Sequence, residues 1–159
     1  MSPEFAAQLR DYLISQINEE RPITRRVLAA VPQDRSSYKP SEKCMSALAL
    51  ASHIASSEVF FLRGIADGQF ARTPVEHKTI DEVLRFYDEE APNAADAVAA
   101  LPGERLVAAL PFAHFTLPAV QYLTIALKHG IHHRGQLSSY LRPMGSRVPS
   151  IYGPSGDEG

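Results

Sequence analysis

Apolar residues recur at the spacing of an α-helix along four long segments of this chain, and proline, glycine or capping residues bound each segment. No segment shows the alternation of apolar and polar residues that indicates a β-strand. The expected helices cover residues 2–30, 41–66, 79–101 and 116–145. Because helices of this length must bury their apolar faces against one another, the sequence predicts an all-α four-helix bundle in a single domain, residues 1–159.

Local signals support the first and third helices. Ser2 is a plausible N-cap with Pro3 at the first helical position, and Thr79 with Glu82 has the spacing of a capping box. Pro92 lies inside the third helix, where it removes a hydrogen bond and clashes with the preceding turn. We therefore expect a kink or a break there.

The fourth helix follows residues 102–115, which predict an irregular or short extended connection. Thr116 is expected to cap this helix, with Pro118 in its first turn and Gly145 at its end. Residues 146–159 then form an extended tail. The tail contains apolar side chains that are expected to pack on the bundle, namely Val148, Ile151 and Tyr152.

The second helix is apolar on two sides, so it is expected to be buried centrally or shared with a second subunit. One stripe contains Met45, Leu48, Val59 and Leu62, and the other contains Leu50, Ile54, Phe61 and Ile65.

Composition excludes some classes of function. The net charge is -2 and the pI is near 6.3, which argues against a nucleic-acid partner. No apolar run reaches the roughly 18 residues of a membrane span, and the N-terminus lacks the apolar core of a signal peptide. The single cysteine, Cys44, fits a reducing compartment and is expected to be a small buried hydrophobe. These features predict a cytoplasmic protein.

Three of the six histidines lie in the string LKHGIHHRGQL, residues 127–137. On a helical wheel, His133 lies about 80° and His129 about 120° to the same side of the core direction, whereas His132 lies at about 180°. His129 and His133 are one turn apart and can direct nitrogens to a shared divalent cation. His132 is expected to face solvent or a neighbouring subunit.

His53 is the third candidate ligand, because an imidazole in the apolar second helix needs a polar partner. If the second and fourth helices are neighbours, three histidines leave coordination positions open, as in catalytic sites. The alternative is a metal-free bundle with hydrogen-bonded core histidines. His77 and His114 lie in connections and are not expected to be ligands.

Arg134 lies about 20° from the core direction, where a guanidinium needs a partner. Glu58, Asp157 and Glu158 are the candidates, and we favour a role in fixing the tail or the helix packing over a role in substrate binding. Gln136 and Tyr140 lie on the histidine side and are candidate hydrogen-bond donors to the ligands or pocket walls. Glu58 itself points about 140° away from His53, which argues against its being the general base of the site.

The strings MSALALASHIASSEVFF, HGIHHRGQLSSYLRPMG and VPSIYGPSGDE resemble the DinB/YfiT-like superfamily of metal-binding four-helix proteins. The resemblance implies an up-down-down-up bundle, frequent homodimers, a bacterial origin and a divalent metal on His53, His129 and His133. Zinc or nickel is expected, with iron or manganese as alternatives.

Members of the superfamily with known activity include thiol S-transferases, and others have been proposed as hydrolases. The resemblance therefore implies a metal-dependent enzyme that activates a thiol or water toward a small-molecule substrate. The substrate could itself be a low-molecular-weight thiol. The alternative is a non-catalytic metal-binding or stress-response protein whose metal is structural.

Overall fold

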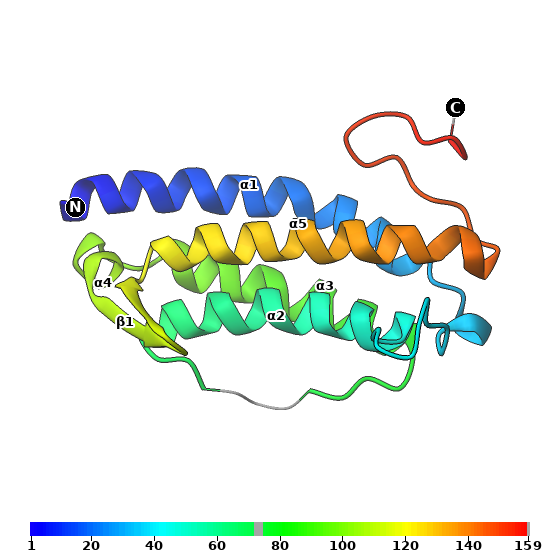
Figure 1. The fold of residues 1–159 in the computed structure, drawn as a ribbon. Helices are drawn as coiled ribbons and strands as arrows, with labels where there is room; N and C mark the ends of the chain where they lie inside the picture. The colour runs from blue at the N-terminus through cyan, green and yellow to red at the C-terminus, as the bar shows by residue number, and fades with distance from the viewer. Residues whose placement is uncertain (72–74, 159) are drawn as a thin grey trace.

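The computed structural model describes residues 1–71 and 75–158. Its long helices form a bundle (Figure 1), and a small two-stranded hairpin lies at one end. In chain order the elements are α1 (Pro3–Ala29), η1 (Gln33–Arg35), α2 (Ala47–Asp67), α3 (Ile80–Ala99), α4 (Gly103–Val107), β1 (Ala109–Phe112), β2 (Phe115–Pro118), α5 (Gln121–Leu141) and η2 (Arg142–Met144).

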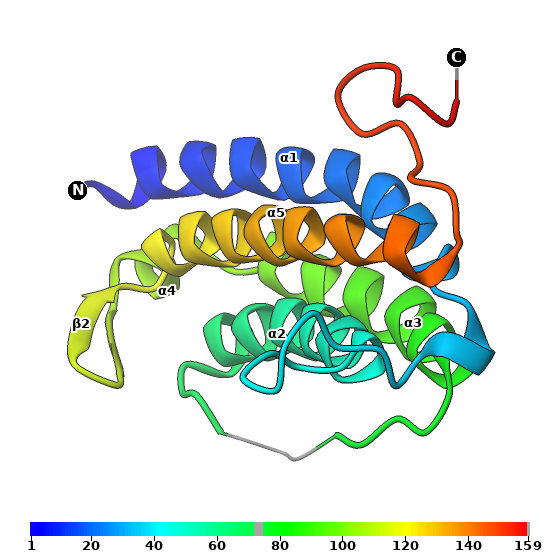
Figure 2. The same ribbon diagram turned by 45° about the vertical axis from the view of Figure 1, so that its right-hand side comes forward.

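The direction of the long helices is up-down-down-up, as predicted. Figures 1 and 2 show α1 and α5 running side by side in one direction, while α2 and α3 both run in the other. Within the bundle α2 packs against α3 and α5, and α1 packs against α3, α5 and the short α4. The helix that carries His53 is therefore the direct neighbour of the helix that carries the other two candidate ligands.

Capping explains the starts of α1 and α3. The Ser2 hydroxyl accepts a hydrogen bond from the backbone N–H of Phe5, and the Thr79 hydroxyl accepts one from that of Glu82. The Glu82 carboxylate in turn reaches back and accepts from the N–H of Lys78, the residue before the N-cap, in a variant of the expected capping box.

The second helix starts later than expected, and the third helix is not broken at Pro92. The second helix begins at Ala47, not near residue 41, because Ser46 is its N-cap and accepts from the N–H of Ala49. The third helix continues through Pro92. Its buried apolar face packs against α1 and α2, and this packing outweighs the one hydrogen bond that the proline removes.

The fourth long helix begins at Gln121, so the prediction that Thr116 caps it was wrong. Thr116 and Pro118 belong to β2, which pairs antiparallel with β1. Strands of four residues are too short to show a clear alternation in the sequence. Gly145 does follow the last helical turn, with a φ of 80° that favours glycine.

Most of the two apolar stripes of α2 is buried within this chain, although Leu48 is half-buried and Met45, which precedes the helix, is 37% exposed. The buried side chains of α2 lie in two hydrophobic clusters, one toward the hairpin end and one toward the opposite end. By length and composition α2 could span a membrane, but it packs between α3 and α5 as the core helix of a soluble protein does. Its two-sided pattern is thus explained without a second subunit.

The tail loops back near the C-terminal end of α1 (Figure 1) and is tied to that helix by hydrogen bonds from the Arg26 guanidinium to the backbone carbonyl of Ser150 and from the Tyr152 hydroxyl to Glu20. Val148 and Ile151 are half-buried and pack against the hydrophobic cluster at the end opposite the hairpin, whereas Tyr152 is 68% exposed. Asp157 accepts from both the N–H of Val148 and the Arg142 side chain, which holds the tail in a loop. The expectation that the tail packs on the bundle is confirmed.

Candidate metal centre

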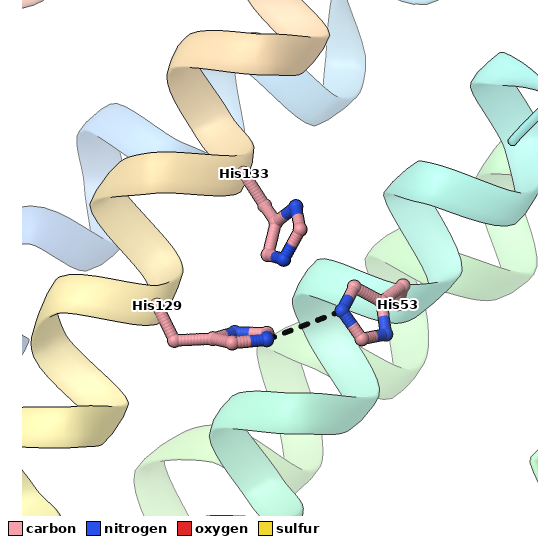
Figure 3. Close-up of side chains that lie close together, drawn as sticks. All are labelled: His53, His129 and His133. Atoms are coloured by element: carbon pink, nitrogen blue, oxygen red, sulfur yellow. Dashed lines mark hydrogen bonds between the residues drawn. The ribbon is translucent and has the colours of Figure 1, made fainter. Parts of the chain in front are cut away.

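Three histidines from two helices converge at the α2–α5 interface. His53 projects from α2 toward His129 and His133 of α5, which lie one turn apart (Figure 3). The ring centroids lie 4.4–4.9 Å apart, and one nitrogen from each ring lies within 4.8 Å of the others. The structure therefore brings together the three residues that the sequence indicated.

The spacing of the nitrogens suits a divalent cation. The Nε2 atoms of His53 and His129 lie 3.2 Å apart. Two imidazole nitrogens bound to one tetrahedral metal at about 2.0–2.1 Å would lie about 3.3 Å apart. The observed distance is also that of a hydrogen bond between the two rings. The cluster could therefore hold a metal ion with little movement of these two side chains.

Neighbouring polar side chains orient two of the three rings. Nδ1 of His133 lies 2.9 Å from Oε1 of Gln136, so the amide oxygen accepts the Nδ1 proton and leaves the Nε2 lone pair toward the cluster. The Gln136 amide donates to the Tyr140 hydroxyl at 3.3 Å. On α2, the Ser57 hydroxyl lies 3.3 Å from Nδ1 of His53. These contacts hold the imidazoles with their Nε2 atoms facing the cluster.

His129 is held neutral at physiological pH. Burial, and to a smaller degree the His133, His53 and His132 rings, lower its pKa to about 4. A neutral imidazole has the lone pair that a metal requires.

This shift predicts how stability depends on pH in the metal-free protein. The folded pKa of His129 lies below the ordinary value of 6.5, so its contribution is complete above pH 6.5 and is lost as the pH falls toward 4. Between pH 7 and 5 we expect the unfolding free energy of wild type to fall by about 1 kcal/mol more than that of His129→Leu, a difference kept small because solvent screens the half-exposed ring. Urea unfolding at both pH values with a chelator present measures these free energies. Equal losses in the two proteins would contradict the prediction.

The other histidines lie outside the cluster. The His132 side chain is exposed, as predicted, although its ring approaches His133 with centroids 4.8 Å apart. His114 is exposed at the turn of the β1–β2 hairpin. His77 forms a hydrogen bond with Ser52.

Arg134 is buried, as expected, but its partners were predicted wrongly. Its side chain is 1% exposed and bonds the carboxylate of Glu20, the hydroxyl of Thr24 and the hydroxyl of Tyr152. Glu20 and Thr24 lie on α1, and Tyr152 lies in the tail, so Arg134 joins α5 to both. This arrangement fits the favoured role in fixing the tail and the helix packing.

The three carboxylates proposed for Arg134 have other partners. Glu58 accepts from Tyr87 at 2.6 Å and from Arg21 at 3.1 Å, so its contacts join α2 to α3 and α1. Burial raises the pKa of Glu58, and Tyr87 and Arg21 oppose this shift. The tail carboxylates Asp157 and Glu158 accept from Val148 and Ser150 backbone N–H groups instead.

Cys44 differs from its prediction. It lies in the turns before α2 and is only half-buried, with its thiol 3.3 Å from the Ser41 hydroxyl. This hydrogen bond lowers the pKa of the thiol, and burial opposes the shift. Ser57 and Glu20 were not expected as contacts. Ser57 follows His53 by one turn, so helical spacing could have indicated it, whereas nothing local connects Glu20 with Arg134.

Comparison with known proteins places this arrangement in a family. The DinB family model matches residues 6–159. The uncharacterised protein YjoA of Bacillus subtilis (strain 168) is 28% identical over 144 residues, which cover 88% of this chain and 94% of YjoA.

Crystal structures of DinB-like proteins have the same fold. The structure of B. subtilis YjoA superposes with a TM-score of 0.72 at 26% identity, covering 91% of this chain and 99% of that one. A DinB-like protein of Bacillus cereus ATCC 10987 gives a TM-score of 0.74 at 20% identity, covering 88% and 95%. Because the family match extends over nearly the whole chain, this protein belongs to the DinB family.

Proposed function

We propose that this protein is a metal-dependent enzyme whose cation is held by His53, His129 and His133. The convergence of three imidazoles from two packed helices carries the proposal. Three protein ligands leave at least one coordination position for a reactant, as in catalytic rather than structural sites. Imidazole ligands suit zinc and nickel best here, with iron or manganese as alternatives.

A divalent cation at this site would lower the pKa of a bound thiol or water and so supply a nucleophile at neutral pH. The chain itself holds the ligands in orientation, because Gln136 hydrogen-bonds to His133 and Ser57 hydrogen-bonds to His53. Cys44 is not part of the histidine cluster, so a thiol reaction needs an external thiol. We therefore infer transfer of a low-molecular-weight thiol to a small substrate, or hydrolysis of such a substrate.

The proposal places the enzyme in the cytoplasm, as a homodimer without a nucleic-acid partner. The net charge of -2 supports the last point. Two large apolar side chains lie exposed one heptad apart on α1, Phe5 at 55% and Tyr12 at 62% exposure, and a second subunit would cover them.

Metal analysis followed by activity measurement tests the proposal. Protein purified without a histidine tag is expected to contain about one divalent cation per chain. Its activity is measured with cysteine or glutathione plus monobromobimane, and with p-nitrophenyl esters. We expect a metal-dependent rate that is lost with a chelator and restored by the cation. Bound metal without activity in either assay would instead indicate a non-catalytic metal-binding protein, and absence of metal would contradict the site.

A further inference from the structure

A second pair of reactive side chains lies outside the histidine cluster. The Ser52 hydroxyl on α2 is 2.8 Å from Nδ1 of His77, which precedes α3. Both residues are half-buried, and the His77 ring is packed against Phe86 with centroids 4.9 Å apart. The contact has the distance of a serine from its general base, and Ser52 is the donor in the tautomer that carries the ring proton on Nε2.

A carboxylate lies near the histidine of this pair. Glu82 is fixed by the backbone N–H of Lys78, the residue after His77, at 2.6 Å. Burial lowers the pKa of His77, and the charge of Glu82 opposes this shift. His77 is therefore neutral at pH 7, and Glu82 favours the imidazolium that forms when His77 takes up a proton.

A cavity of about 320 Å³ lies next to Phe86 and one helical turn along α2 from Ser52, with walls formed by described residues other than Ser52 and His77. Phe86, which contacts the His77 ring, also lines the cavity, and so does Ser56, one turn after Ser52 on α2. The volume is that of a small-molecule site. Its walls include the apolar side chains of Val59, Phe60 and Phe86, and an ion pair of Arg63 and Glu90 at 3.4 Å.

We propose that Ser52 is a nucleophile activated by His77 and that its substrates are small carboxylic esters with a short apolar acyl group. In the step, the Ser52 oxygen bonds to the acyl carbon while its proton passes to Nδ1 of His77. The ester C–O bond then breaks, and the leaving alcohol takes that proton. Water releases the acyl group as a carboxylic acid and restores the serine. No metal ion takes part.

The position of Ser52 inside a helix predicts slow turnover. The backbone N–H groups around Ser52 are engaged in the hydrogen bonds of α2, so this helix offers no backbone donors to an oxyanion. We therefore expect an acylated serine to accumulate. p-Nitrophenyl butyrate should release a burst of about one equivalent of p-nitrophenolate per chain, followed by a slow phase.

Covalent labelling of the full chain with a short-chain alkyl fluorophosphonate tests the assignment. The serine oxygen replaces fluoride on phosphorus, and the mass rises by one phosphonyl group. Peptide mapping is expected to place this group on Ser52. Labelling should proceed at the same rate with excess EDTA, because it needs no metal ion. The result is therefore independent of whether the proposed metal-dependent activity is found.

Variants identify the base. Ser52→Ala should abolish labelling, and His77→Gln should slow it by at least about a hundredfold. The matched controls are Ser139→Ala on α5 and His114→Gln in the hairpin turn, both exposed positions where we expect wild-type labelling. A label on another residue, no label at all, or a Ser52 label that forms as fast in His77→Gln would each overturn the proposal.

Discussion

His129→Ala is expected to weaken zinc or nickel binding by more than a hundredfold. His129 contacts both partners, with its Nε2 3.2 Å from that of His53 and its ring centroid 4.4 Å from that of His133. Removing it leaves two ligands on different helices. The loss should exceed the roughly 10- to 100-fold that hydrogen-bond partners of ligands typically contribute. Competition titration against a chromophoric chelator, with untagged protein, measures the dissociation constants.

His132→Ala is the matched control, since it removes an exposed imidazole from the same helix. We expect near wild-type affinity, because His132 is not part of the cluster. Thermal unfolding gives a second readout, as metal at 100 times its dissociation constant stabilises the folded state by about 2.7 kcal/mol. That increment should persist in His132→Ala and vanish in His129→Ala. Equal losses of affinity in the two variants would show that the cluster is not the binding site.

Arg134→Ala is expected to destabilise the protein by about 3 kcal/mol, or roughly 6–12 °C in Tm. The arginine side chain is 1% exposed and that of its partner Glu20 is 22% exposed, so the variant leaves a largely buried carboxylate without its cation. Thr24 and Tyr152 lose a hydrogen-bond donor as well. Chemical denaturation at pH 7 measures the change in unfolding free energy.

Arg25→Ala provides the comparison. Arg25 also joins two helices through a carboxylate, Asp88 at 2.7 Å, but the two side chains are 48% and 41% exposed. Water screens such a pair, so its removal should cost less than about 1 kcal/mol. If both variants lost the same stability, burial of Arg134 would not be what makes its contacts strong.

Local features of the sequence predicted most of the helical framework. The capping residues Ser2 and Thr79 and the glycine at position 145 depend on hydrogen bonds or backbone angles within one turn, and all three function as expected. The hairpin was missed because its strands are four residues each, and the break considered at Pro92 does not occur because packing outweighs the local penalty.

The candidate site, too, was predicted from the sequence only where it depends on contacts within one helix. The sequence alone determined that His129 and His133 share one side of a helix, because the 3.6-residue repeat holds wherever that helix forms. It also determined that Arg134 lies on the buried side. Only the tertiary structure decided that His53, 76 residues before His129, meets it, and that Glu20, 114 residues before Arg134, pairs with it. Those contacts depend on which helices are neighbours, and neighbours are selected by the burial of whole apolar faces rather than by any local pattern.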